Sequence, residues 1–344
     1  YAILDEAQLI KNPKAKVTQA CLSIQAKHRL ALSGTPIENS ALDLWTIFRF
    51  LMPGLLGGRK EFENELVADP EATANLLRRQ VTPFVLRRIK SEVAKELPPK
   101  IENELPCILN DEQRKEYRSL TEGAIREHGD NLQDAIKHAP THVFALLTRL
   151  RQVCCDLALL PWREGMAPSG SKGGILLEKL AELTSSGTKI IVFSQFTSYL
   201  RILKKAITQQ IPDLQILELT GSTRNRTLPV ETFENSPGPT VILASLKAAG
   251  LGVTLKSADY VFLMDPWWNP AVEEQAIDRA HRLGRTKPTF VYRMVTKGTV
   301  EERVRALQIS KKETFHKIIG EMDRPSVLAD HFSSLKDLVE LTED

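Results

Sequence analysis

Short apolar runs alternate with helical patterns along the second half of the chain. Such runs are typical of strands that are buried on both faces, and the intervening segments repeat their apolar residues at helical spacing. Strands are predicted at residues 189–193, 216–219, 240–244, 260–264 and 290–295. Helices are predicted at residues 197–210, 271–283 and 300–319, with a further helix near Glu231. This alternation predicts a doubly wound, mainly parallel sheet.

The first half of the chain carries a smaller version of this pattern. One apolar run ends at Asp5-Glu6, and a second, Arg29–Leu32, leads into Ser33-Gly-Thr-Pro36. Two strands joined by a helical crossover predict part of a parallel α/β sheet, with too few strands to complete one. Residues 53–160 are largely helical in pattern. Residues 161–174 are rich in Pro, Gly and Ser, which predicts a linker.

The composition is that of a globular protein. At 344 residues, 42% hydrophobic and 26% charged, the chain has room for about two domains and does not resemble collagen, coiled coils or disordered proteins. No apolar run approaches the roughly 18–20 residues that cross a bilayer, so no membrane partner is expected. None of the four Cys has C-x-x-C spacing. Cys154 and Cys155 are expected to fill core volume, in a reducing intracellular setting, rather than to bind metal.

The net charge of the chain gives little indication of its partners. The chain has 46 Lys and Arg against 43 Asp and Glu, spread evenly between its two halves. Neither half is a basic nucleic-acid module by bulk charge. Any DNA would therefore have to be held by a local track of residues.

Polar residues follow both predicted strands of the first half. Asp5-Glu6-Ala-Gln8 lies at the carboxyl end of a strand, where open α/β sheets place ligands. Adjacent carboxylates there can divide the work, one holding Mg²⁺ near phosphates and one polarising a water. The alternative is an acidic cap on the next helix. The hydroxyls of Ser33 and Thr35 can relay between a phosphate site and a neighbouring surface, or can belong to an ordinary strand-to-helix turn.

The most specific pattern lies between residues 262 and 285, FLMDPWWNPAVEEQAIDRAHRLGR. Gln275, Arg279 and Arg282 are spaced i, i+4 and i+7, so a helix through them carries all three on one face. Two arginines on one face suit the clamping of a transferring phosphoryl group. The alternative is a solvated charged face that pairs with Glu274 and Asp278.

Aromatic residues and glycines accompany two other predicted strands. Trp267-Trp268-Asn-Pro270 precedes the helix, and exposed aromatics beside arginines are a nucleic-acid feature, although one of the two tryptophans is expected in the core. Lys247-Ala-Ala-Gly-Leu-Gly252 follows a strand, and its glycines let backbone amides approach an anion closely. Gly221-Ser-Thr223 can likewise touch phosphates or form a polar turn.

Taken in order, seven segments resemble the Swi/Snf-type ATPases, superfamily-two helicase-like motors that translocate on double-stranded DNA. They are DEAQLIKN (5–12), LALSGTPIEN (30–39), IIVFSQFT (190–197), LTGSTRNR (219–226), ILASLKAAGLGVTL (242–255), DPWWNP (265–270) and QAIDRAHRLGR (275–285). The joining segments PFVLRRIKSEVAKELPPK (83–100) and LRQVCCDLALL (150–160) are similar too. The resemblance extends from Tyr1 to about residue 320.

The resemblance implies ATP and Mg²⁺ as cofactors and assigns a catalytic role to several matching residues. Asp5 would coordinate Mg²⁺, and Glu6 would orient and activate the attacking water. Gln275 would contact the nucleotide region. Arg279 and Arg282 would be arginine fingers from the second lobe.

The same resemblance implies further nucleotide, coupling and DNA contacts. Gly250 and Gly252 would line the nucleotide site between the lobes. Thr35 would help to couple hydrolysis to lobe movement, and so would Gln8, which stands where His is commoner. Residues expected to follow the backbone or the minor groove of double-stranded DNA are Trp268, Gln195, Ser245 and Lys247. Ala249 and Arg285 also depart from the family pattern, without removing a catalytic group.

One motif of an ATPase is not found in the sequence. The phosphate-cradling G-x-x-x-x-G-K-[ST] loop does not occur in the 344 residues. Because Tyr1 already lies in a strand pattern, we expect the chain to be the carboxyl-terminal part of a longer protein that carries this loop upstream. We expect the isolated chain to be inactive as an ATP hydrolase.

These observations predict an α/β fold of RecA-like parallel-sheet lobes, the first truncated and the second complete, with helical protrusions between them. The expected domains are a first-lobe remnant (1–52), helical protrusions (53–160), a linker (161–174), the second lobe (175–320) and a helical tail (321–344). The expected function is ATP-dependent translocation on duplex DNA or remodelling of a nucleoprotein complex, in the nucleoid of a prokaryote or the nucleus of a eukaryote. The alternatives are a non-catalytic DNA-binding module derived from such a motor and a strand-separating helicase.

Overall fold

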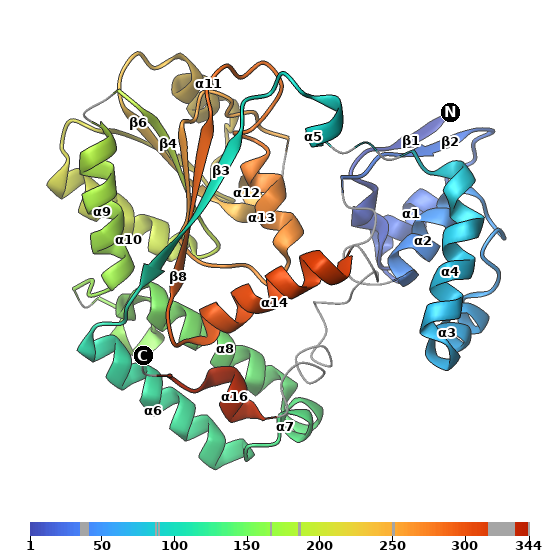
Figure 1. Cartoon of the computed structure of the whole chain (residues 1–344), viewed down its shortest axis with the longest axis horizontal. Coiled ribbons are helices and arrows are strands. Elements are labelled where there is room, and N and C mark those ends of the chain that lie inside the picture. Colours follow the sequence, from blue (N-terminus) through green and yellow to red (C-terminus); the bar gives the residue numbers. More distant parts are fainter. Residues whose placement is uncertain are drawn as a thin grey trace. The chain divides into compact units, whose positions relative to one another are not determined.

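A computed structural model describes residues 1–34, 41–86, 88, 90–165, 167–184, 187–249, 252–315 and 334–342. The chain forms two compact units, whose elements are labelled in Figure 1. The first comprises Tyr1–Val93 and Ile309–Arg324, and the second comprises Ala94–Gln308 and Pro325–Asp344.

The first unit is built on a two-stranded parallel sheet, as the sequence predicts. Its elements are β1 (Ala2–Leu4), η1 (Ala7–Ile10), α1 (Lys16–Leu22), β2 (Arg29–Ala31), α2 (Ala41–Leu51), α3 (Arg59–Ala68), α4 (Pro70–Val81), η2 (Thr82–Phe84) and α5 (Lys90–Val93). Ala2, Leu4 and Ala31 of the two strands pack against a small core that contains Ile47 and Phe50 of α2. This packing fixes the carboxyl ends of β1 and β2 side by side.

The second unit is built on a six-stranded parallel sheet. Its strands are β3 (Lys100–Cys107), β4 (Lys189–Ser194), β5 (Gln215–Leu219), β6 (Thr240–Ser245), β7 (Tyr260–Leu263) and β8 (Thr289–Thr296), in the spatial order β3-β8-β7-β4-β6-β5. The helices that cover the sheet are α9 (Ser171–Thr184), α10 (Thr197–Gln210), α11 (Thr227–Asn235), α12 (Leu246–Ala249) and α13 (Pro270–Ile277). The unit is therefore α/β, with the parallel sheet that the sequence predicts.

Side chains of the central strands alternate between two cores. Ile190 and Val192 of β4 face the core that includes α9 and α10, whereas Ile191 and Phe193 face the core that includes α12 and α13. Figure 1 shows α9 and α10 on one side of the sheet and α12 and α13 on the other. Because both faces are covered, these strands read as continuous apolar runs in the sequence.

A helical module completes the second unit. It consists of α6 (Asp111–His128), α7 (Leu132–His138), α8 (Pro140–Cys155) and α16 (Leu335–Val339), followed along the chain from α8 by η3 (Leu157–Leu159) and η4 (Pro161–Arg163). The capping box of Asn110 and Gln113 starts α6, and Gly129, at φ 73°, ends it. Cys154 and Cys155 are fully buried free thiols of α8, in agreement with their predicted place in the core.

The last described residues, 334–342, are tied to this unit by backbone hydrogen bonds. The Leu335 amide donates to the Asp130 carbonyl (2.7 Å), and the Thr342 amide donates to the Gly298 carbonyl (3.0 Å). Gly298 has φ 67°, and a Cβ placed there would overlap the carbonyl oxygen of Thr342. Only glycine satisfies both the backbone angle and this close approach.

The substitution Gly298→Ala is therefore expected to lower the stability of the protein by more than about 1 kcal/mol and to release residues 334–342. Amide hydrogen exchange at these residues would show the release, and denaturant unfolding would measure the stability. Gly174→Ala is the matched control, because a Cβ there has no atom within 4 Å. In α9 this change is expected to stabilise by up to about 1 kcal/mol. Equal behaviour of the two variants would contradict the explanation.

The structure corrects the prediction that residues 53–160 form helical protrusions. Residues 100–107 form β3, which pairs in parallel with β8 along its whole length. The strand was missed because it lies at the edge of the sheet, where most of its side chains are exposed, and Glu102, Asn103 and Glu104 at its centre interrupt any apolar run. Two of these side chains form ion pairs with arginines of β8 and α14 (Val300–Phe315): Glu102 with Arg293 (3.1 Å) and Glu104 with Arg305 (3.3 Å). The break between the two units accordingly falls at residues 93–94, before β3.

The predicted linker at 161–174 is also partly wrong, because α9 already begins at Ser171. Lys172 is fully buried, and its ammonium donates to the carbonyls of Met264 (2.7 Å) and Met294 (3.2 Å) and to the Glu301 carboxylate (2.5 Å). Burial acts to lower the pKa of Lys172, but the Glu301 carboxylate and the neighbouring cysteines together act more strongly in the other direction, so the pKa is raised. Lys172 thus connects the segments around Met264 and Met294 to α14, and it belongs to the folded core and not to a linker.

Candidate functional site

The carboxyl end of β1 presents the two predicted carboxylates. Glu6 has φ 52° and ψ 50°, and among the described residues it is the one non-glycine residue at positive φ. Such a conformation costs about 1–3 kcal/mol and occurs mainly at functional sites. The Glu6 amide donates to the Asp5 carboxylate (2.9 Å), while the Glu6 side chain makes no capping bond to η1. A purely acidic helix cap therefore does not account for this pair.

A hydrogen-bonded chain connects Glu6 to the second strand of the unit. The Gln8 side-chain amide donates to the Glu6 carboxylate (2.6 Å), and the Ser33 hydroxyl donates to the Gln8 side-chain oxygen (2.7 Å). The carboxylate at the end of β1 is thus linked to the Ser-Gly-Thr-Pro turn after β2. Thr35, the predicted coupling residue of that turn, lies outside the described residues.

The predicted DNA-binding residues come together at the carboxyl edge of the six-stranded sheet. β6, β4 and β7 are neighbours, and their register sets Ser194 opposite Ser245. Gln195 therefore follows one strand, Ser245 ends the next, and Trp268 follows the third. Ser245 is buried and its hydroxyl accepts a hydrogen bond from the Ala248 amide (3.3 Å), whereas Lys247 is exposed on α12.

A buried carboxylate joins two of these segments. Asp265 is fully buried and accepts hydrogen bonds from the Ser194 hydroxyl (2.5 Å) and the Gln195 amide (3.3 Å). Burial raises the pKa of Asp265, and the nearby Arg151 guanidinium acts against this rise. The segment after β4 is thereby fastened to the segment that carries both tryptophans.

Arg151 of α8 was not singled out from the sequence, although it lies in the family-like segment LRQVCCDLALL. It is almost fully buried, donates to the Pro266 carbonyl (2.5 Å) and lies 3.6 Å from the Asp265 carboxylate. Its guanidinium also stacks on three rings, at 5.6 Å from Trp267, 5.7 Å from Trp268 and 5.8 Å from Phe196. Both tryptophans are half-buried, and Trp267 packs against the core that includes α12 and α13, as expected for one of the pair.

The predicted arginine pair does not lie on the helix with Gln275. α13 carries the half-buried Gln275 but ends at Ile277, so the expected helix 271–283 is too long by about two turns. The Arg279 carbonyl accepts a hydrogen bond from the Leu255 amide (2.9 Å), a partner from outside the helix. The Ile277 carbonyl still accepts hydrogen bonds from the Ala280 and His281 amides (2.9 and 3.0 Å), and the Leu255 contact, which the sequence pattern does not reveal, uses a carbonyl that a longer helix would need.

Arg279 and Arg282 nevertheless lie beside the segment that follows the glycine-containing loop. The Arg282 guanidinium donates to the Thr254 hydroxyl (2.9 Å), next to the Leu255 contact of Arg279. Gly252, two residues earlier, has φ 76°, which favours glycine. Gly250 lies outside the described residues. The structure therefore brings Gly252, Arg279 and Arg282 into one region of the second unit.

The acidic residues of α13 are structural. The Glu273 carboxylate is buried, accepts a hydrogen bond from the Trp267 amide (2.6 Å) and pairs with Arg293. Glu274 pairs with Lys100 (2.8 Å) and Arg293 (3.1 Å). Glu274 therefore fastens α13 to β3 and β8 instead of forming the solvated face that was the alternative expectation.

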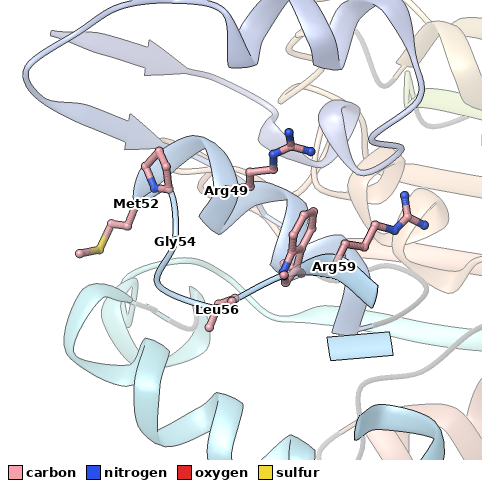
Figure 2. Close-up of a pocket in the computed structure, with 9 residues that line it drawn as sticks. Arg49, Met52, Gly54, Leu56 and Arg59 are labelled. Atoms are coloured by element: carbon pink, nitrogen blue, oxygen red, sulfur yellow. The ribbon is translucent and has the colours of Figure 1, made fainter. Parts of the chain in front are cut away.

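The first unit also holds a cavity of about 400 Å³ at the end of α2. Figure 2 shows Arg49 and Arg59 extending to one side of it and Met52 to the other. The Arg49 guanidinium stacks on Trp45 (5.6 Å), and Arg59 pairs with Glu63 (2.7 Å). None of the site residues predicted from the sequence lines this cavity.

Among the described residues, no helix is both long enough and apolar enough to cross a membrane.

Two protein-family domains match successive parts of the chain. Residues 1–159 match the SNF2-related domain, and residues 173–284 match the Helicase conserved C-terminal domain. An uncharacterized ATP-dependent helicase of Mycoplasma pneumoniae is 37% identical over 322 residues, which cover 93% of this chain and 31% of that protein. The human TATA-binding protein-associated factor 172 is 31% identical over 405 residues, covering 100% of this chain and 22% of that protein. The chain thus spans less than a third of the length of these curated relatives.

Two solved structures are matched over a larger share of their own length. The Sulfolobus solfataricus SWI2/SNF2 ATPase core in complex with dsDNA is 31% identical with a TM-score of 0.59, covering 99% of this chain and 73% of that one. The SWI2/SNF2 ATPase core domain of the same organism is 30% identical, with a TM-score of 0.58, covering 99% of this chain and 71% of that one. The chain therefore belongs to the SWI2/SNF2 family of helicase-like ATPases.

Proposed function

We propose that this chain is part of an ATP-dependent motor that moves along duplex DNA. The observation that carries the proposal is the grouping of Gln195, Ser245 and Trp268 at one edge of the second sheet. Asp265 accepts a hydrogen bond from the Gln195 amide, and Arg151 lies over the Trp268 ring. Polar and aromatic groups fixed along a sheet edge form a narrow track for a nucleic-acid backbone, which needs no strongly basic surface. The net charge of +3 is consistent with such a track.

ATP and Mg²⁺ are the proposed cofactors. Asp5 would hold the metal, and Glu6 would act on the water that attacks the γ-phosphate. The residues present fit this assignment, because both are acidic, follow a strand and are not consumed by helix capping. Glu6, Gln8 and Ser33 are joined by hydrogen bonds, so a change in the position of the Glu6 carboxylate would shift the turn after β2, which contains Thr35.

Arg279 and Arg282 would neutralise charge on the phosphoryl group during transfer, and Gln275, Gly250 and Gly252 would contribute to the same nucleotide site. The contacts of Arg279 and Arg282 with residues 254–255 support this role, because they fix the arginines beside the glycine-containing loop. Both lobes would act on a single ATP, and its hydrolysis would shift their arrangement and advance the motor along the duplex.

The partner proposed for the motor is duplex DNA within a nucleoprotein complex. One relative is named as a TATA-binding protein-associated factor, and the Sulfolobus core was solved with dsDNA. The residues described above contact DNA in this proposal, whereas the choice of protein complex would depend on other surfaces.

The test measures ATP hydrolysis by the longest natural polypeptide that contains this sequence, with and without duplex DNA. Duplex DNA is expected to accelerate hydrolysis. The exposed Lys247 contributes one phosphate contact in this proposal, so Lys247→Ala should reduce by about 1 the slope of log affinity for duplex DNA against log salt. Lys137→Ala, at an exposed lysine of α7, is the control and should leave the slope unchanged.

Each alternative function makes a different prediction in these experiments. Salt-dependent duplex binding without any ATP hydrolysis would favour a non-catalytic module. Release of a labelled strand from a duplex would favour a strand-separating helicase. A polypeptide that hydrolyses ATP at the same rate with and without duplex DNA would contradict the proposed motor.

A further inference from the structure

Two histidines and a glutamate meet at one end of the helical module. Glu127 and His128 are the last two residues of α6, and His142 lies in the first turn of α8. One potential ligand atom from each of the three lies within 4.8 Å of the others. The two imidazole rings have their centres 5.2 Å apart at an angle of 45°, and His128 Nε2 lies 3.8 Å from the Glu127 carboxylate. We propose that these three side chains bind a divalent transition-metal ion, with Zn²⁺ as the physiological ion.

The donor set selects this class of metal. Two imidazole nitrogens and one carboxylate oxygen suit Zn²⁺ and its neighbours Co²⁺ and Ni²⁺, whereas Mg²⁺ and Ca²⁺ prefer oxygen ligands throughout. Zn²⁺ binds nitrogen and oxygen at about 2.0–2.2 Å, so neighbouring ligands in a tetrahedral site lie about 3.4 Å apart. The separation of 3.8 Å between His128 and Glu127 is close to this value. A water would take the fourth position.

The backbone around the site is already fixed. Gly129, at φ 73°, ends α6 directly after His128, and the buried Val143 anchors α8 next to His142. His128 is partly buried, with 16% of its side chain exposed, while Glu127 is 67% exposed and free to rotate towards a metal. The three side chains can therefore reach a bound ion by rotation alone, without movement of the backbone.

A metal here would act on the fold of the helical module. It would join the end of α6 to the start of α8 and so close the loop that contains α7. The adjacent Asp130 accepts hydrogen bonds from the amides of Leu335 (2.7 Å) and Lys336 (2.8 Å), so the same turn also holds the C-terminal segment. Metal binding is expected to protect residues 129–141 and 334–342 from hydrogen exchange.

The experiment uses tag-free protein that has been stripped with a chelator and then titrated with Zn²⁺ by calorimetry, and with Co²⁺ by visible absorption. Wild-type protein is expected to bind one Zn²⁺, and Co²⁺ is expected to give the intense absorption of a four-coordinate ion. His142→Ala and Glu127→Ala should each lower the affinity for Zn²⁺ by at least about 10-fold, the lower end of the loss seen on removing even an indirect ligand contact. His138→Ala is the matched control, because His138 is an exposed histidine of α7 outside the cluster.

Circular dichroism of the apo proteins separates a lost ligand from a lost fold, since both variants should retain the wild-type spectrum. No Zn²⁺ binding by the wild-type protein, or equal binding by wild-type protein and His142→Ala, would overturn the proposal. These titrations contain neither nucleotide nor DNA. Their outcome is therefore independent of whether the protein is the proposed motor.

Discussion

Replacing Arg279 by alanine is expected to lower the rate of ATP hydrolysis in the presence of duplex DNA by about 10³-fold or more. Arginine fingers stabilise charge that develops on the phosphoryl group in the transition state, so their loss affects kcat more than the affinity for ATP. Only the side chain changes in this variant. The hydrogen bond from the Leu255 amide to the Arg279 carbonyl can persist, and with it the fold of the loop.

Measurement of kcat and KM for ATP on the longest natural polypeptide would separate the two effects. Arg201→Ala, at an exposed arginine of α10, is the matched control and should leave both constants unchanged. Arg282→Ala should share the direction of the Arg279 effect, because Arg282 contacts the same loop through Thr254. An Arg279→Ala protein with wild-type kcat would refute the arginine-finger assignment.

Lys172→Met is expected to cost about 3–5 kcal/mol of stability, because it leaves the fully buried Glu301 carboxylate without its cation. The carbonyls of Met264 and Met294 also lose their shared donor. Urea unfolding of the variant and the wild-type protein would measure the difference.

Two further variants test whether the loss comes from the buried charge. Lys179→Met lies on the same helix and breaks an exposed pair with Glu182 (2.7 Å), which is expected to cost no more than about 0.5 kcal/mol. In the double variant Lys172→Met/Glu301→Leu, neither charge remains buried, so a large part of the lost stability should return. A double variant less stable than Lys172→Met would show that packing, and not the orphaned charge, accounts for the loss.

Most strands of the second lobe can be predicted from the sequence because they are buried on both faces. The four central residues of β4 and of β6 all lie in one core or the other, so each strand reads as an unbroken apolar run between polar ends. The family motifs at the ends of these strands then place Gln195, Ser245 and Trp268 at one edge. Strand order follows from none of these patterns, but the shared edge does, since parallel strands end on the same side.

Features that depend on partners remote in the sequence were not predicted. The end of α13 at Ile277 depends on the Leu255 amide, which lies more than twenty residues earlier. Arg151 and Lys172 look like ordinary surface cations in the sequence, and their burial arises only when α8 and α9 pack on the ends of the strands. A cation in a family-like segment, such as Arg151 in LRQVCCD, was the one available signal.

The position of β3 decides what can fold independently. The match to the Helicase conserved C-terminal domain covers residues 173–284, which excludes β3 and β8. A fragment cut at those limits would leave β7 at the rim of its sheet, and one cut at residue 175 and extended to the C-terminus would do the same to β8. An uncovered rim strand presents a row of free amides and carbonyls that invites pairing with other molecules and aggregation. The boundary visible in the sequence is therefore not a folding boundary, and soluble expression of this lobe should require a start before Lys100.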